Sequence, residues 1–133
     1  MIGQINKKMK IPFKILVVED DLITQEILSL YLLEYEHVTV VASGEDAIAK
    51  CMSDVFDIVL MDIRLKIGID GVQTFKKIKE INTYKDIPVL AITAYAIRGD
   101  KEYFLEQGFN GYLAKPFVKD TFLGFIKQFL PRT

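Results

Sequence analysis

Five short apolar segments recur along the chain, and each one is followed by a polar residue. Most of these segments are rich in Val, Ile and Leu and lack a strict alternation of apolar and polar positions. Continuous apolar runs of this length are typical of strands buried on both faces of a parallel sheet. The pattern predicts strands over residues 14–19, 37–42, 57–61, 89–93 and 110–114.

Apolar residues spaced three or four positions apart predict a helix after each strand. These apolar positions are Ile23, Ile27, Leu30 and Tyr31, then Ala47, Ile48, Cys51 and Met52, then Val72, Phe75, Ile78 and Ile81, then Tyr103, Phe104 and Leu105, and finally Phe122, Phe125, Ile126 and Phe129.

Several polar residues and glycines indicate where the helices begin and end. Ser43 has the side chain of a helix N-cap, and a later helix is expected to begin near Gly71. Gly99 interrupts the helical pattern of the next segment, so we expect a loop up to Gly99 and a short helix capped by Asp100. Gly108 is a suitable residue to end that helix.

The regular alternation of strands and helices defines the fold class. It implies βαβ units, a parallel sheet, right-handed crossovers and helices on both faces of the sheet. We therefore predict an α/β fold in which residues 14–133 form one domain and residues 1–13 form a poorly anchored N-terminal extension.

Composition narrows the class of protein. The chain has 133 residues, of which 50% are hydrophobic and 26% are charged, and its formal net charge is −1. Such a balance, with scattered Lys and Arg, argues against direct binding to nucleic acid. Cys51 is the single cysteine, which excludes an internal disulfide and a cysteine-rich metal site. No stretch predicts a membrane span, and the first residues lack a signal-peptide core, so we expect a cytoplasmic protein.

The chemistry is expected where the strands end. Asp62 directly follows the third predicted strand, and the carboxyl ends of parallel strands meet at one edge of the sheet. The residues that follow the other strands should therefore lie near Asp62, and they are Glu19, Asp20 and Asp21 after the first strand, Thr93 at the end of the fourth, and Lys115 after the fifth.

This set of groups suits phosphoryl transfer. Clustered carboxylates repel one another unless a cation intervenes, and Mg²⁺ prefers carboxylate, phosphate and water oxygens. A lysine and a threonine can hold phosphoryl oxygens, which leaves Asp62 as the nucleophile. The residues thus predict an Mg²⁺-assisted transfer that yields an aspartyl phosphate.

The acids after Ile15–Val18, the Asp62 that follows an apolar run, Thr93-Ala94 and Lys115-Pro116-Phe117 together resemble the receiver domain of two-component response regulators, the CheY-like superfamily. The resemblance extends from about Lys14 to Leu130. It implies a flavodoxin-like, doubly wound sheet of five strands in the order 2-1-3-4-5 with five helices. It also implies a phosphoryl donor, either a histidine kinase or a histidine phosphotransfer protein.

By position, the resemblance assigns roles within the site. Asp62 would be the phosphoacceptor and a metal ligand, and Asp20 would be the other carboxylate bound directly to Mg²⁺. Glu19 would complete the acidic pocket indirectly, and Arg64 would offer its backbone carbonyl to the metal. Thr93 and Lys115 would hold phosphoryl oxygens.

Similar proteins are switches and not enzymes, apart from their own phosphorylation and dephosphorylation. Thr93 would move toward the phosphoryl group, and Tyr112, three residues before Lys115, would turn inward behind it. The surface of the fourth helix, fifth strand and fifth helix would then change its affinity for a downstream protein or form a homodimer. We expect no direct contact with nucleic acid or membrane, and either a stand-alone receiver or a receiver fragment of a hybrid kinase or multidomain regulator.

The chain departs from the family pattern in the loop after Asp62. The family often has proline four residues after this Asp, where this chain has Lys66, and the loop to Gly71 is one residue longer than the commonest form. Arg64 and Tyr95 occupy positions that tune dephosphorylation in similar proteins, and we hypothesise that Tyr95 shields the acyl phosphate. The family's cis bond before proline would fall at Lys115–Pro116.

Two other function classes compete with the switch. An aspartate-nucleophile phosphatase would need a second Asp two residues after the nucleophile, and Arg64 stands there instead. A pseudo-receiver, acting as a constitutive interaction module, would have a disrupted pocket, whereas the pocket residues are present. Asp21 has a simpler interpretation as a cap of the first helix, and Tyr112 as a core residue.

Overall fold

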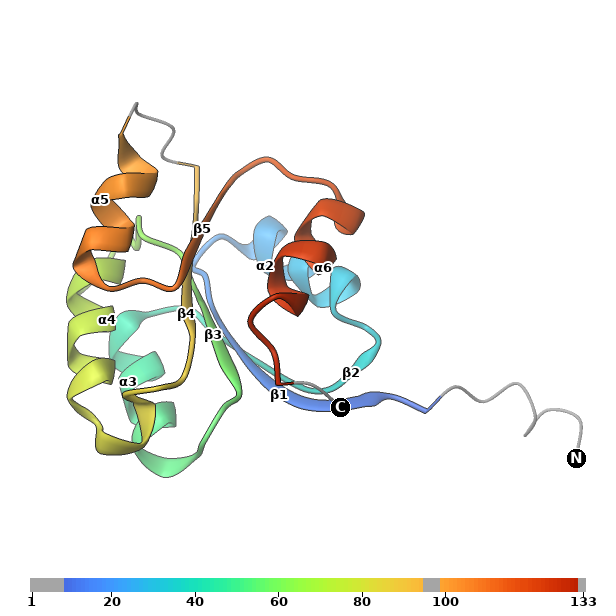
Figure 1. The fold of residues 1–133 in the computed structure, drawn as a ribbon, viewed down its shortest axis with the longest axis horizontal. Coiled ribbons are helices and arrows are strands. Elements are labelled where there is room, and N and C mark those ends of the chain that lie inside the picture. Colours follow the sequence, from blue (N-terminus) through green and yellow to red (C-terminus); the bar gives the residue numbers. More distant parts are fainter. Residues whose placement is uncertain (1–8, 95–98, 132–133) are drawn as a thin grey trace, which may run out of the picture.

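The computed structural model describes residues 9–94 and 99–131. Five parallel strands form one sheet in the order β2-β1-β3-β4-β5, which confirms the predicted flavodoxin-like fold (Figure 1). The strands are β1 (Ile11–Val18), β2 (Tyr35–Val41), β3 (Ile58–Met61), β4 (Val89–Thr93) and β5 (Gly111–Ala114). The helices are α2 (Leu22–Tyr31), α3 (Gly44–Ser53), α4 (Gly71–Glu80), α5 (Asp100–Gln107) and α6 (Lys119–Lys127), with a short 3₁₀ turn, η1 (Asn82–Tyr84).

The sheet separates two hydrophobic cores, because successive strand residues point to opposite faces. Leu16 and Val18 of β1 pack with α3, α4 and α5 on one face. Ile15 and Val17 pack with α2 and α6 on the other face, and Figure 1 shows the two helical layers on either side of the strands. Both faces are covered, which explains why the strands are continuous apolar runs in the sequence.

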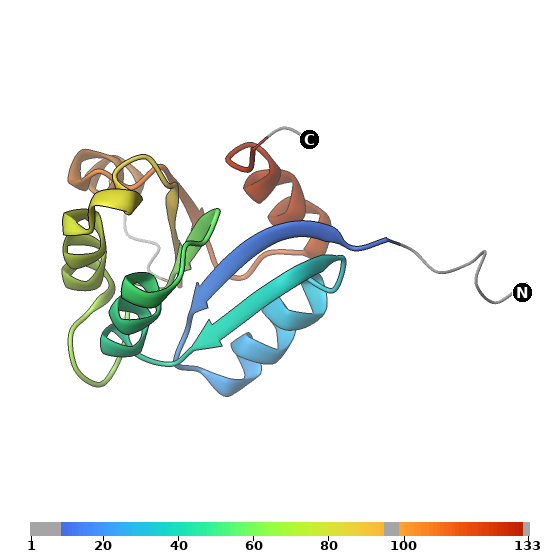
Figure 2. The ribbon, with the colours of Figure 1, turned by 90° about the horizontal axis from the view of Figure 1, so that it is seen from below.

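Strand β1 begins earlier than the sequence pattern predicts. It starts at Ile11 instead of Lys14, and the Ile11 N–H donates to the carbonyl of Glu34 at 2.7 Å. The register shifts between Ile11 and Lys14, around Pro12. Strand β2 also starts early, at Tyr35, whose side chain is only 4% exposed. Figure 2 shows the two extended strands running side by side.

Two polar residues predicted inside strands lie just before them. Asp57 precedes β3, and its carboxylate accepts a hydrogen bond from the Lys14 N–H at 2.7 Å. Asn110 precedes β5, and its side-chain oxygen accepts from the Val89 N–H at 3.0 Å. Each side chain caps a strand amide, while the N–H groups of Asp57 and Asn110 still donate to the Lys14 and Val89 carbonyls and extend the backbone pairing by one residue.

The apolar residues of α2 are arranged differently from the predicted stripe. Ile23, Ile27 and Leu30 are 68%, 40% and 59% exposed, while Leu28 and the following Leu32 are almost completely buried. The helix is apolar on both sides, and only the side containing Leu28 faces the sheet. The helix therefore presents a row of aliphatic side chains to solvent.

The ends of the other helices follow local capping rules. Ser43 caps α3 as predicted, with its hydroxyl accepting from the Asp46 N–H at 3.1 Å. Asp70 caps α4 through a capping box with Gln73. Asp100, in contrast, is the first residue of α5 and not its cap, because Gly99 precedes it in a left-handed conformation, with φ of 91°. Gly108 ends α5 in the same conformation, as predicted.

The last helix is shorter than its apolar pattern. Helix α6 ends at Lys127, so Phe129 lies beyond it and is half-buried. Phe122 and Ile126 are fully buried against α2 and the sheet. Between β5 and α6, the Lys115–Pro116 peptide bond is cis.

Tyr84 of η1 joins two loops in the interior and provides a test of this packing. It is fully buried, and its hydroxyl donates to the Asp54 carbonyl at 2.7 Å and accepts from the Phe56 N–H at 3.0 Å.

Tyr84→Phe leaves both backbone groups without this partner, so we expect the free energy of unfolding to fall by about 1–3 kcal/mol in urea denaturation. The exposed Tyr103 is the matched control, and Tyr103→Phe should change stability by less than about 0.5 kcal/mol. Equal stability of the two variants would contradict this role.

Candidate functional site

Three carboxylates converge at the carboxyl edge of the sheet. Glu19 follows β1 and Asp62 follows β3, and their N–H groups extend the sheet by donating to the carbonyls of Val41 and Val18. Both side chains are buried, at 2% and 6% exposure. With the half-buried Asp20, they offer oxygens that all lie within 4.8 Å of one another. The predicted acidic pocket is therefore assembled by strand ends distant in the sequence.

Lys115 supplies positive charge to this cluster. Its N–H donates to the Thr93 carbonyl at 2.9 Å, which continues the pairing of β4 with β5 and directs the chain to the same edge. Its Nζ lies 2.5 Å from Glu19 Oε1 and 3.9 Å from Asp62 Oδ2. One ammonium group thus faces two carboxylates of a cluster of three.

Burial, together with the neighbouring charges, changes the protonation of Glu19. Burial raises the pKa of Glu19 from 4.5 to about 7, and the charge of Asp62 adds to this increase. Hydrogen bonds from Lys115 and from the Asp21 N–H oppose it. Folding therefore favours the protonated carboxyl, and without a bound cation its contribution to stability is lost as the pH rises from about 4.5 through 7.

Thr93 and Arg64 lie beside this cluster. Thr93 ends β4 and is fully buried, opposite Ala114 in the strand register. The Arg64 N–H donates to Asp62 Oδ1 at 3.2 Å, which orients the carboxylate, while the Arg64 side chain is exposed. The edge therefore combines a hydroxyl, an ammonium group and carboxylates, as the sequence predicts.

Two other predicted residues lie away from the carboxylates. Asp21 turns to cap α2, accepting from the Thr24 N–H at 2.9 Å, and the hydrogen bonds from Thr24 lower the pKa of Asp21. Tyr112 lies on β5, and its ring stacks on Phe104 of α5 with a centroid separation of 5.7 Å. Tyr95 lies outside the described residues.

The loop after β3 adds a contact that residue types do not predict. The Lys66 N–H donates to Asp20 Oδ2 at 2.9 Å. Proline, common at this position in receiver domains, has no N–H and could not make this bond. The only sign of this donor in the sequence is that residue 66 is a lysine and not a proline.

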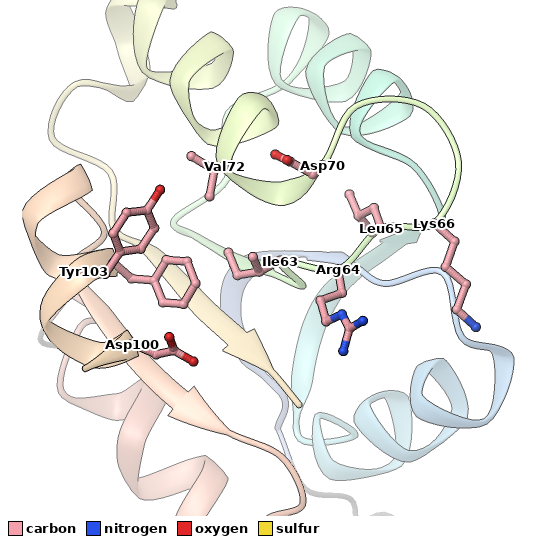
Figure 3. A pocket seen from close by; sticks show the side chains of 9 residues that line it. Ile63, Arg64, Leu65, Lys66, Asp70, Val72, Asp100 and Tyr103 are labelled. Carbon is pink, nitrogen blue, oxygen red and sulfur yellow. The ribbon is translucent and has the colours of Figure 1, made fainter. Parts of the chain in front are cut away.

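A cavity of about 500 Å³ opens beside the site, between this loop and α5 (Figure 3). Its apolar lining includes Ile63, Leu65 and Val72, and Tyr103 reaches toward Val72 across the opening (Figure 3). Arg64 and Lys66 extend from the opposite side of the loop (Figure 3). The acidic edge of the sheet is thus bordered by open space rather than by a covering segment of the described chain.

The donor set fits a hard divalent cation. Carboxylate oxygens are ligands that Mg²⁺ prefers, and a dication at this point would neutralise the charge of the clustered carboxylates. No thiol or imidazole is part of the cluster that the described residues form, so a soft metal has no suitable ligands there.

Comparison with known proteins places these features in a family. A family model described as the response regulator receiver domain matches residues 15–127. Hybrid signal transduction histidine kinase I of Dictyostelium discoideum is 36% identical over an alignment of 121 residues, and the match covers 85% of this chain and only 7% of that protein. The polar-differentiation response regulator DivK of Brucella anthropi is 28% identical over 120 residues, which are 90% of this chain and 97% of that protein.

A solved structure shares the fold of this chain. The receiver domain of sensor histidine kinase PA1611 from Pseudomonas aeruginosa PAO1 is 34% identical, with a TM-score of 0.80, and the match covers 89% of this chain and 97% of that one. That structure contains a magnesium ion coordinated in its active site cleft. In the described part of the present chain, no helix has the length and apolar character needed to cross a membrane.

The raised pKa of Glu19 predicts that cation binding depends on pH. Mg²⁺ competes with a proton on this carboxyl, so its affinity should fall below pH 7 by up to about tenfold per pH unit. Calorimetric titration at pH 6, 7 and 8 measures this dependence and the protons released. Glu19→Gln should bind Mg²⁺ more weakly with a flatter pH profile. A wild-type affinity that stays constant from pH 8 to 6 would contradict the prediction.

Proposed function

Because the chain belongs to the response regulator receiver domain family, we propose that it is a phosphorylation-controlled signalling switch whose phosphoacceptor is Asp62. The observation that supports this most directly is the site geometry. The buried Asp62 carboxylate lies with Glu19 and Asp20 in one acidic cluster and has Lys115 Nζ 3.9 Å away. A nucleophile, a metal-binding pair and a phosphoryl-binding cation thus occupy one edge of the sheet.

The transfer step uses these groups in distinct ways. A carboxylate oxygen of Asp62 forms a bond to phosphorus as the bond from phosphorus to the donor nitrogen breaks, and the donor imidazole keeps the electron pair. Lys115 and the Thr93 hydroxyl hold the equatorial phosphoryl oxygens. Asp20, Asp62 and the Arg64 carbonyl would hold Mg²⁺, which would supply neutralisation of the charge on the transferring group.

The phosphoryl donor is a phosphohistidine on a histidine kinase or a phosphotransfer protein. The family and the histidine kinase relative support this class of donor. The match covers only 7% of the hybrid histidine kinase, but it covers 97% of the regulator DivK. Both a stand-alone regulator and a receiver within a larger signalling protein agree with this assignment.

The exposed face of α2 supports docking of a protein donor. Ile23 lies two residues after the Asp21 cap, so the aliphatic row begins beside the acidic site. Farther along, Leu30 and Leu33 line a groove of about 430 Å³ with Val40 of β2. An apolar surface that starts at the phosphoacceptor edge can seat the helix that carries the donor histidine.

The output would travel from Thr93 to Tyr112. Thr93 and Tyr112 lie on the neighbouring strands β4 and β5, and Tyr112 stacks on Phe104, the buried anchor of α5. Movement of Thr93 toward the phosphoryl group would open space for the Tyr112 ring. Turning that ring would remove a contact of α5 and alter the α5–β5–α6 surface, which would then bind a partner or a second copy.

Phosphorylation with a small donor tests the switch. With Mg²⁺ and acetyl phosphate, the wild-type protein should gain the mass of one phosphoryl group, and Asp62→Asn should gain none. Beryllofluoride, which mimics the phosphoryl group, should change the sedimentation coefficient of the wild type and leave that of Asp62→Asn unchanged. If neither reagent modifies the wild type, the proposed switch is wrong and the chain acts as a constitutive interaction module instead.

Docking on α2 is tested by comparing phosphoryl transfer from a protein donor with labelling by acetyl phosphate, which needs no docking surface. Ile23→Ser should slow transfer from a phosphorylated histidine phosphotransfer domain, chosen because it labels the wild type, by about tenfold, while labelling by acetyl phosphate stays unchanged. Met52→Ser is the matched control, since Met52 is 73% exposed at the far end of α3. Equal transfer rates for the two variants would exclude α2 as the docking surface.

A further inference from the structure

The loop between β3 and α4, residues 62–70, carries part of the site on an extended path. Its apolar residues Ile63 and Leu65 are buried, but Ile67 is 84% exposed and Gly68 adopts a φ of +80°. Between Leu65 and Asp70 the loop thus bulges away from the core. Hydrogen bonds therefore contribute to its position in addition to the packing of Ile63 and Leu65.

The inner part of the loop is bonded to the site itself. The Arg64 N–H donates to Asp62 and the Lys66 N–H donates to Asp20 Oδ2. Both acceptors belong to the acidic cluster. The orientation of the Asp20 carboxylate therefore depends on where the loop places the Lys66 amide.

The outer part of the loop is held by Glu45, in the first turn of α3. Glu45 Oε2 accepts from the Ile69 N–H at 3.1 Å. The same carboxylate lies flat against Gly68, where an added Cβ would be 2.6 Å from both of its oxygens. The positive φ favours glycine at residue 68, and the Glu45 carboxylate occupies the space where a side chain would begin.

The first turn of α3, which carries Glu45, packs tightly against α4. The backbone of α3 approaches α4 so closely that a Cβ on Gly44 would be 2.0 Å from Thr74 Oγ1 and 2.8 Å from Ile69 Cγ1. Thr74 is fully buried, and its hydroxyl donates to the Asp70 carbonyl at 2.7 Å. Displacement of Glu45 is therefore resisted by the contact between two helices.

We propose that Glu45 is a positioning residue for the metal site, holding the loop so that the Lys66 amide fixes Asp20. Glu45 touches neither the cation nor the phosphoryl group, and it acts through Ile69, Gly68 and Lys66 on the Asp20 carboxylate. The inference rests on the proposed function for the identity of the site. It adds a residue outside the acidic cluster that supports the metal site. This support depends on the Lys66 N–H, which a proline at residue 66 would lack.

Three variants separate the hydrogen bond from the charge. Glu45→Ala removes the acceptor, and Mg²⁺ affinity measured by calorimetry should fall by about tenfold, as for other outer supports of metal ligands. Glu45→Gln keeps an oxygen acceptor and should restore the affinity to within about twofold. Asp46→Ala removes an equal charge from the next position on α3 and should also stay within about twofold.

Hydrogen exchange reports on the loop independently of activity. In Glu45→Ala, exchange of the Ile69 and Lys66 amides should accelerate, while amides of β1 and β3 keep their protection. Unchanged Mg²⁺ affinity in Glu45→Ala would overturn the proposal. An equal loss of affinity in Asp46→Ala would also overturn it, because the effect would then be one of charge.

A double-mutant cycle tests the contact with Gly68. Gly68→Ala should weaken Mg²⁺ binding in the wild-type background, and it should do so less in Glu45→Ala, where the clash with the carboxylate is absent. Additive effects would contradict the contact.

These measurements need no phosphodonor, so they also distinguish the two proposals. If acetyl phosphate fails to label the wild type while Glu45→Ala still loses affinity for Mg²⁺, the switch fails and the positioning role stands. A wild type that binds no Mg²⁺ at millimolar concentration would overturn both.

Discussion

Burial of like charges at one edge of the sheet is the constraint on which the site depends. Glu19 and Asp62 are held out of water at the ends of adjacent strands, with Lys115 as the cation that contacts both. Such an arrangement is unfavourable by itself, since desolvation and mutual repulsion both oppose ionisation. The hydrophobic packing of the two cores supplies the free energy that keeps the carboxylates there. The same arrangement makes the edge receptive to a dication or to a change in charge.

Much of the fold and the site could be predicted because the relevant signals are local. A polar residue that stops an apolar run marks a strand end, and parallel strands bring such ends together, as for Asp62, Thr93 and Lys115. The boundaries were less predictable. Ile11 belongs to β1 because Glu34, distant in sequence, offers a carbonyl, and no local pattern carries that information.

Two further features could not be derived from residue types. Helix α2 is apolar on both sides, so periodicity alone could not choose between the row with Ile23 and the row with Leu28, and the sheet makes that choice. The Lys66 amide and its acceptor Asp20 are joined by the path of the backbone, which has no compositional signature. Asp100 was expected to cap α5, but Gly99, with its positive φ, takes the position before the helix.

Helix α5 combines two glycines with a minimal anchor. Left-handed residues bound it at Gly99 and Gly108, and Phe104 is its one fully buried side chain. The aromatic contacts of Phe104 with Phe109 and Tyr112 therefore carry most of its attachment. With a single buried side chain, α5 buries little apolar surface, and local opening of this helix would leave the pairing of β4 with β5 unbroken. The packing of one aromatic ring, Phe104, would then govern how readily this short helix opens.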